Sequence, residues 1–323
     1  MGLTTTDLAW REFWAQQGPH GSTGCLPARW QSVFATLERT WRAFASRLPQ
    51  GARVLDLATG DARVLHWIGT GRPDAVLTGI DLAPQLPQPP PGVDLRPATA
   101  MEDLPFADAS FDAIVSQFGI EYGDTPQVAQ EIARVASEDA AVGTVIHRGD
   151  GAILSHNIAR AEQIRWVVDE ISLMARTKAA LNDEPPPWPD ATVMVAEIVE
   201  QGRTKHGDQS AAWERPEAVR RSLLMGAHAG DTATGIATLL DRIEAQARNE
   251  LARIASLEVA CATADARDGF LGAFAAAGLA VSETEELSDA QMRAIGAAMN
   301  AAHGSTSRVD VHVPRRVDAV AVR

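Results

Sequence analysis

The sequence predicts an α/β protein with a mostly parallel sheet covered by helices on both faces. Short apolar runs alternate with helical stretches between residues 53 and 147. This alternation is expected when each strand reaches its parallel neighbour through a helix. The predicted strands are Arg53–Leu57, Ala75–Ile80, Phe111–Ser116 and Ala141–His147, and the predicted helices are Asp61–Gly69 and Gln127–Ala136.

Helical regions and a late return of the sheet pattern surround this core. Apolar residues recur every three or four positions from about Thr6 to Leu48, which predicts N-terminal helices. After Asp150 about a hundred residues carry only helical periodicity, including a long stripe from Ile236 to Leu257. A helix from about Ala266 to Ala277 then leads into strands at Leu279–Thr284 and Val317–Val322.

These patterns predict three parts. Residues 1–48 form an N-terminal helical cap, and residues 49–150 together with 263–323 form the sheet-containing core. Residues 151–262 form a helical insertion that we expect to cover the substrate as a lid.

Composition excludes several classes of partner. The net charge of −13 would repel a phosphate backbone, so nucleic acid is not an expected ligand. Cys25 and Cys261, the only cysteines, match no zinc or disulfide spacing. No stretch approaches the roughly 20 apolar residues of a membrane span, and the N-terminus lacks the apolar core of a signal peptide. We expect a cytoplasmic protein without a membrane partner; its oligomeric state is left open, with a homodimer as one alternative.

The candidate ligand site follows the first predicted strand. That strand delivers Asp56 to the carboxyl edge of the sheet, and Ala58 to Gly60 form the turn into the next helix. Ligands of open parallel sheets bind beyond this edge, where the strand order reverses, and small residues in the turn let the backbone approach them. Asp81 ends the next strand, where a carboxylate can accept hydrogen bonds from two ribose hydroxyls. The pattern predicts a nucleoside-containing cofactor.

The glycine content of this turn distinguishes between such cofactors. A dinucleotide needs G-x-G-x-x-G to bring its pyrophosphate against a helix N-terminus. Only Gly60 is present here, and Asp61 adds a negative charge that would be unfavourable beside a phosphate. A cofactor with an amino-acid tail and no phosphate therefore fits the turn better.

Four sequence blocks follow one another along the predicted sheet. They are Val54–Gly60, Thr78–Asp81, Glu102–Phe106 with Ser110–Ser116, and Glu131–Val135. Together they resemble the class I methyltransferases that use S-adenosylmethionine, in particular the small-molecule branch related to the ubiquinone and menaquinone biosynthesis methyltransferases. The resemblance covers about residues 50–148 and, more weakly, 265–323. It implies a Rossmann-like, seven-stranded, mostly parallel sheet and methyl transfer to a small apolar or aromatic acceptor.

The resemblance also implies roles for individual residues. The turn holds the methionine end of the cofactor, Asp81 holds the ribose and Met101 holds the adenine through its backbone. Ser116 and Gln117 lie under the sulfonium and the methyl group. The full set of expected cofactor-binding residues is Asp56, Ala58, Thr59, Gly60, Asp81, Leu82, Met101, Glu102, Ser116 and Gln117.

Two positions depart from the family pattern. An acidic residue often precedes the Met101 position to bind the adenine amino group, but this chain has Ala100 there. Glu102 or a backbone group must then substitute. The third glycine of the usual D-x-G-x-G-x-G motif is Ala62, a change that is tolerable if this residue is already helical.

The candidate catalytic residues are Tyr122, His147 and His156. Tyr122, the only tyrosine, could orient substrate or take part in proton transfer, and His147, at the end of a predicted strand, could act as a general base. His156 lies at the entrance to the helical insertion. A packing or solvent-facing role is the alternative for each of the three, and Glu121 is interpreted as solvated.

Tryptophans are unevenly distributed, since seven of the eight lie in the N-terminal helices or the insertion. Some of these indoles could line an apolar or aromatic substrate pocket. The alternative is that they attach the added helices to the core. Two other functions also stay open: a non-catalytic scaffold or sensor that binds S-adenosylmethionine or S-adenosylhomocysteine, and, less favoured, an NAD-dependent oxidoreductase.

Overall fold

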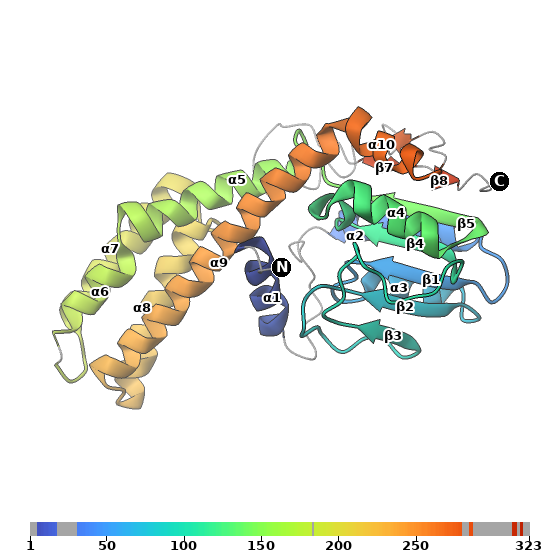
Figure 1. The fold of residues 1–323 in the computed structure, drawn as a ribbon. Helices are drawn as coiled ribbons and strands as arrows, with labels where there is room; N and C mark the ends of the chain where they lie inside the picture. Colours follow the sequence, from blue (N-terminus) through green and yellow to red (C-terminus); the bar gives the residue numbers. More distant parts are fainter. Residues whose placement is uncertain are drawn as a thin grey trace. The chain divides into compact units, whose positions relative to one another are not determined.

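The computed structural model describes residues 5–17, 31–182, 184–279, 284–286, 312–314 and 317–318. The chain divides into two compact units (Figure 1). The first comprises Met1–Ser155 and Ser256–Arg323, and the second comprises His156–Ala255. The second unit lies within the predicted insertion. Its predicted role as a substrate lid depends on how the two units are placed and stays a prediction.

The first unit has a Rossmann-like α/β fold built on one main sheet. Five strands of this sheet run parallel, in the order β3-β2-β1-β4-β5, and β8 pairs antiparallel with β5 at the edge. The strand order reverses between β1 and β4, so the open edge beyond β1 is the expected ligand position. The strands are β1 (Arg53–Leu57), β2 (Val76–Ile80), β3 (Val93–Arg96), β4 (Phe111–Gln117), β5 (Ala136–Val145) and β8 (Val317–Asp318).

The prediction of seven strands in one sheet was wrong for the described residues, whose main sheet has six. β6 (Thr284–Glu286) pairs with β7 (His312–Pro314) in a separate two-stranded sheet instead of extending the main one. Residues 280–283 and 319–322 of the two predicted late strands lie outside the described residues. β3 was not predicted, because a four-residue edge strand with alternating half-buried and exposed positions carries a weak apolar signal.

Helices cover both faces of the main sheet. Along β1, Val54 points into the core beneath α2 (Gln31–Ala45) and α3 (Arg63–Gly71), whereas Leu55 points into the core beneath α4 (Thr125–Val135) and α10 (Arg267–Ala276). This alternation follows from the two-residue period of a strand. Both neighbours are fully buried, as expected for a sheet packed on both sides.

The N-terminal helical region contains α1 (Thr5–Gln17) and α2, and residues 18–30 between them lie outside the described part. α2 has a strongly apolar face: Leu37, Trp41 and Ala45 recur at intervals of four and are almost completely buried. The short 3₁₀ helix η1 (Ile120–Tyr122) follows β4 and precedes α4.

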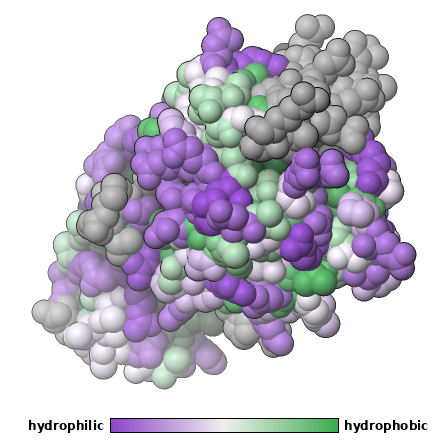
Figure 2. All heavy atoms as spheres, turned by 45° about the vertical axis from the view of Figure 1, so that its right-hand side comes forward, coloured by the Kyte–Doolittle hydropathy of each residue, from purple (hydrophilic) through white to green (hydrophobic). Residues whose placement is uncertain are grey.

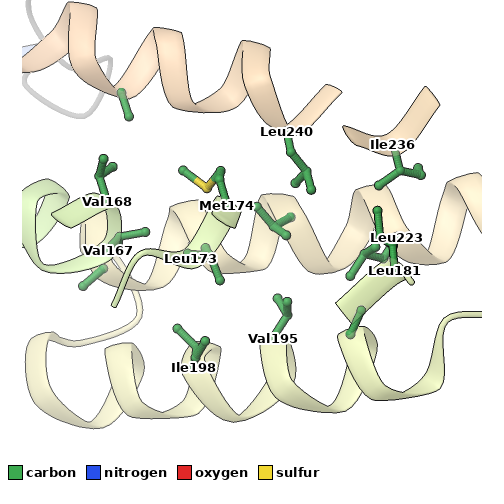
Figure 3. Packing of buried hydrophobic residues seen from close by; sticks show 14 of the residues in the cluster. Val167, Val168, Leu173, Met174, Leu181, Val195, Ile198, Leu223, Ile236 and Leu240 are labelled. Carbon is green, nitrogen blue, oxygen red and sulfur yellow. The ribbon is translucent and has the colours of Figure 1, made fainter. Parts of the chain in front are cut away.

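The second unit is entirely helical in its described residues. Figure 3 shows its core, where aliphatic side chains from several helices interdigitate, among them Val195, Leu223 and Leu240. These three side chains are fully buried, so the unit has a hydrophobic core of its own. It contains most of α5 (Ala152–Arg165), the π-helical η2 (Trp166–Glu170), α6 (Leu173–Leu181), α7 (Pro189–His206), α8 (Ala211–Ala229) and the first two thirds of α9 (Ala233–Asp265).

The surface of the molecule is mainly hydrophilic on the face shown in Figure 2, where apolar spots are interspersed among polar and charged residues. Within the described ranges, no helix combines the length and apolar character that a membrane crossing requires.

Candidate functional site

The carboxyl ends of β1 and β2 meet at one edge of the sheet. Leu57, the last residue of β1, is in register with Ile80, the last residue of β2. The turn after β1 is tied to β2 because the Thr59 N–H donates to the Ile80 carbonyl at 2.8 Å. Asp56 and Asp81 are thereby brought to the same edge, as predicted.

The turn after β1 has an unusual backbone. Ala58, Gly60 and Ala62 all have positive φ, at 54°, 55° and 56°. A left-handed conformation costs an L-residue about 1–2 kcal/mol and is free of that cost only in glycine. The condition under which alanine would be tolerable at position 62, that the residue is already helical, is not met, because Ala62 is the left-handed N-cap residue and α3 begins at Arg63. Two strained alanines in one turn are typical of a functional site, where surrounding structure holds them in place.

Gly60 is the point where the N-terminal helix meets this turn. A Cβ atom on Gly60 would lie 2.4 Å from Cζ2 and 2.7 Å from Cη2 of Trp14. Trp14 comes from α1 and is 8% exposed. The absence of a side chain at Gly60 therefore lets the indole ring pack directly on the backbone of the turn.

The Asp81 carboxylate is held in place by two backbone groups. One oxygen accepts the N–H of Gly60 at 3.0 Å and the other accepts the N–H of Ala83 at 2.9 Å. Each carboxylate oxygen can accept two hydrogen bonds, so one acceptor position remains on each. Burial raises the pKa of Asp81, and the two backbone hydrogen bonds oppose this change.

Asp56 is the most deeply buried acid of the site, at 1% exposure. Its Oδ2 accepts the Thr59 hydroxyl at 2.6 Å, while Oδ1 has no hydrogen-bond partner among the described residues. Burial raises the pKa of Asp56 to about 8; the Thr59 hydrogen bond lowers it, and the charges of Asp81 and Asp61 raise it further. Asp56 is therefore largely protonated at neutral pH.

Asp61 has a different environment from the one we expected. Its carboxylate pairs with the guanidinium of Arg63 at 2.6 Å. Because Arg63 balances its charge, Asp61 contributes less against a phosphate than the sequence indicated. The argument against a dinucleotide therefore depends on the turn having Gly60 as its single glycine.

The remaining predicted cofactor residues fall into two groups. In the group expected to hold the adenine, Leu82 is 42% exposed, and the carboxylate of Glu102 accepts the backbone N–H of Asp124 at 3.1 Å. A Cβ on Gly123 would lie 2.6 Å from Glu102 Oε1 and 2.7 Å from Met101 Cε. Met101 and Glu102 thus lie against the loop before α4, where Glu102 has a structural contact.

The second group follows β4. Ser116 is buried and its hydroxyl donates to the Leu57 carbonyl at 2.9 Å. Gln117 accepts the indole N–H of Trp41 at 2.8 Å. Both side chains are therefore fixed beside the end of β1, and Gln117 is fixed from the N-terminal helical region.

A carboxylate–imidazole pair lies just beyond this edge. Glu121 Oε1 lies 2.8 Å from His147 Nδ1 and also accepts the His147 backbone N–H at 2.9 Å. The interpretation of Glu121 as solvated was wrong, since this residue is 2% exposed and His147 is 9% exposed. The second oxygen of Glu121 has no hydrogen-bond partner in the described part of the chain. Sequence reasoning missed Glu121 because its partner lies 26 residues away.

Aromatic rings surround His147. The Phe118 ring centroid lies 4.3 Å from the imidazole, and the Tyr122 ring is perpendicular to it at 5.9 Å. Tyr122 in turn contacts Trp10 edge to face at 5.7 Å. The structure therefore brings two of the three predicted catalytic residues together. His156 lies in α5 and is the first residue of the second unit, so the described geometry does not place it in this site.

Some tryptophans lie at the candidate site, whereas others pack in a hydrophobic core. Trp10 and Trp14 lie at the site, whereas Trp166 and Trp188 are buried in the core of the second unit, where they stabilise its packing. Trp30 lies outside the described residues.

Part of the chain that holds this site is similar to known proteins. Residues 55–142 match a family model described as a methyltransferase domain. The chain is 32% identical over 117 residues to the ubiquinone/menaquinone biosynthesis C-methyltransferase UbiE of Geotalea uraniireducens (strain Rf4), a match covering 32% of this chain and 50% of that protein. It is 32% identical over 153 residues to the demethylmenaquinone methyltransferase of Roseiflexus sp. (strain RS-1), covering 45% of this chain and 63% of that protein.

The matched segment therefore spans about half to two thirds of these relatives. Among solved structures, the chain is similar to a SAM-dependent methyltransferase from Aquifex aeolicus, with 19% identity, a TM-score of 0.30, and coverage of 35% of this chain and 64% of that one.

Proposed function

We propose that this chain, which carries a methyltransferase domain within residues 55–142, transfers a methyl group from S-adenosylmethionine to a small-molecule acceptor. The observation that carries the proposal is the Asp81 carboxylate, which two backbone N–H groups hold beside the Gly60 turn. The relatives' names suggest an aromatic, quinone-like acceptor, and the aromatic rings around His147 suit one.

The residues present suit this cofactor. The two remaining acceptor positions on Asp81 match the two hydroxyls of a ribose. The unpartnered Oδ1 of Asp56 offers a buried acceptor near the turn, and Leu82 offers exposed apolar surface for a base. When bound, S-adenosylmethionine supplies an electrophilic methyl group on a positively charged sulfur.

Glu121 and His147 are suited to proton transfer. With Nδ1 protonated and donating to Glu121, the imidazole presents the lone pair of Nε2 as a base. Glu121 is then a positioning residue, because it fixes the tautomer and the ring orientation. An acceptor hydroxyl, amine or acidic carbon would lose its proton to His147 as it attacks. Tyr122 and Phe118 restrict the position of the ring and limit access of water to it.

Several broader properties belong to this proposal. We infer a cytoplasmic enzyme. We also infer that it has no nucleic-acid partner, because a net charge of −13 would repel a phosphate backbone. A homodimer is compatible with the proposal and is tested by the mass of the protein in solution.

The first test is cofactor binding by titration calorimetry with S-adenosylhomocysteine. Asp81→Ala should weaken binding more than tenfold, since it removes both ribose acceptors, a loss of at least about 1.4 kcal/mol. Asp94→Ala is the matched control, because Asp94 lies on the neighbouring edge strand and, among the described residues, forms its ion pair with the exposed Arg96. Equal affinity of the Asp81 variant and the wild type would refute the ribose assignment.

The second test separates an enzyme from a binding protein. Transfer of a labelled methyl group to a panel of quinols, phenols and amines should show at least one accepted class. Tight S-adenosylhomocysteine binding without transfer to any class would favour a non-catalytic scaffold or sensor. Binding of NAD in place of S-adenosylhomocysteine would favour an oxidoreductase.

A further inference from the structure

An aromatic face of α1 lies against the candidate site. Trp10 and Trp14 are four residues apart in this helix, so their side chains lie on the same side of it. The Trp10 ring contacts Tyr122 edge to face at 5.7 Å, and its indole N–H donates to the Ser256 hydroxyl at 3.2 Å. α1 lies outside residues 55–142, which match the methyltransferase family model, so that match assigns no role to it.

Trp14 covers the turn after β1. Gly60 has no side chain, and the six-membered ring of the Trp14 indole takes the space that a Cβ atom would occupy there. The indole is buried, and the Phe13 ring contacts it at 5.0 Å. Within α1, Trp10 therefore lies beside the residues proposed for proton transfer, and Trp14 lies beside the turn proposed for the cofactor.

Gly60 lies between the two groups that we assign to opposite parts of the cofactor. Its N–H donates at 3.0 Å to Asp81, the carboxylate proposed to hold the ribose. Ala58, proposed to hold the methionine end, comes two residues earlier in the same turn. In S-adenosylmethionine the sulfonium is the atom that joins the methionine chain to the ribose. A cofactor held at both points therefore carries its sulfonium past Gly60, next to Trp14.

An aromatic ring is a suitable partner for a sulfonium. The sulfonium has three carbon substituents and no N–H or O–H group, so it cannot donate a conventional hydrogen bond to a carboxylate. Asp61 and Asp81 also have other partners: Asp61 pairs with Arg63 at 2.6 Å, and Asp81 accepts the N–H groups of Gly60 and Ala83. The face of an aromatic ring attracts a cation without a hydrogen bond, and tryptophan does so best among the side chains.

We propose that Trp14 is a cofactor-binding residue whose indole face contacts the sulfonium, so that the site prefers a positively charged cofactor to a neutral one. S-adenosylhomocysteine, which remains after the methyl group is transferred, has a neutral thioether in place of the sulfonium. The contact weakens when the methyl group leaves, which favours exchange of S-adenosylhomocysteine for a new cofactor. The inference rests on the proposed function, because it takes S-adenosylmethionine as the cofactor.

The experiment compares three ligands by calorimetry on the full chain at constant ionic strength. S-adenosylmethionine carries the sulfonium, sinefungin carries an ammonium group at nearly the same position, and S-adenosylhomocysteine is neutral there. Trp14→Leu keeps an apolar side chain but removes the aromatic ring. We expect Trp14→Leu to weaken binding of each of the two cationic ligands roughly three- to thirtyfold more than binding of S-adenosylhomocysteine.

Two further variants separate the ring from the rest of α1. Trp14→Phe keeps a smaller aromatic ring and should retain part of the preference for the cationic ligands. Leu8→Ala is the control, because Leu8 lies in α1 and is 53% exposed; it should bind all three ligands like the wild type. Circular dichroism shows whether each variant is folded, and if Trp14→Leu is not, the preference of Trp14→Phe relative to the wild type decides.

Three outcomes would overturn the role of Trp14. Equal weakening of all three ligands in Trp14→Leu would mean that the ring only packs against the cofactor, and tighter binding of all three would mean that the ring occupies the position of the cofactor. Unchanged binding would mean that the ring does not contact the cofactor. In each case binding of S-adenosylhomocysteine to the wild type leaves the proposed function intact. If the wild type binds none of the three ligands, the proposed function fails and this inference fails with it.

Discussion

Replacing Gly60 by alanine should disturb the site through two separable effects. The first is conformational: at φ 55° an alanine costs about 1–2 kcal/mol, of which about 0.4–1 kcal/mol is recovered from the reduced entropy of the unfolded chain. The second is steric, because the new Cβ would lie 2.4 Å from Trp14 Cζ2. The indole must move away, and α1 loses part of its contact with the turn.

The structure allows the two effects to be measured apart. Gly51 has φ 67° and nothing within 4 Å of its Cβ position, so Gly51→Ala reports the conformational cost alone, at most about 1.6 kcal/mol. Gly60→Ala should cost about 2–4 kcal/mol, since displacement of a buried tryptophan forfeits part of the 3–5 kcal/mol typical of its removal. In a Trp14→Ala background the steric part should disappear.

The assay is a double-mutant cycle by urea unfolding, followed by circular dichroism. We expect Gly60→Ala and Trp14→Ala to be coupled by at least about 1 kcal/mol, because they remove the same contact. Additive free energies, within about 0.5 kcal/mol, would refute the packing of Trp14 on Gly60. The Gly51 variant should be additive with Trp14→Ala.

Three further predictions concern charge, catalysis and the helical core. The pKa of Asp56 is raised from 3.8 to about 8, so between these pH values the folded state holds a proton that the unfolded state has lost. The contribution of Asp56 to the free energy of unfolding should therefore fall as the pH rises from about 4 to about 8. The urea midpoint of Asp56→Asn should fall less than that of the wild type over the same pH range. His147→Gln should lower kcat about 10²-fold or more. Glu121→Gln should lower kcat less and leave KM unchanged. If Glu121→Gln changed KM alone, the positioning role of Glu121 would be contradicted. Leu240→Ala should destabilise the helical unit by about 2–5 kcal/mol in thermal or urea unfolding, because the side chain is fully buried, and a loss below about 1 kcal/mol would contradict that packing.

Two features of the turn after β1 raise its free energy: buried carboxyl groups and left-handed alanines. Asp56 and Asp81 are carried to the sheet edge by buried strands, and burial raises the pKa of both carboxyl groups. The left-handed alanines Ala58 and Ala62 add conformational cost at the same turn. A cationic ligand at Asp56 would offset part of this cost.

The sequence by itself determined the frame of the site. β1 has the predicted bounds Arg53–Leu57 because a short, mainly apolar run bounded by turn residues has few alternatives as a buried strand. The positions of Asp56 and Asp81 follow from the ends of β1 and β2, since parallel neighbours end at the same edge of a sheet. The helical character of the insertion likewise follows from local periodicity.

The tertiary structure alone decided which distant residues meet. Glu121 becomes a buried partner of His147, Trp14 packs on Gly60, and Glu250 joins two arginines from other helices. Hydrophobic periodicity reports only on whether a residue faces a core, and a charged side chain gives the same local signal in water or in a buried pair. Contacts between elements far apart in the chain depend on packing, so they could not be predicted from this sequence.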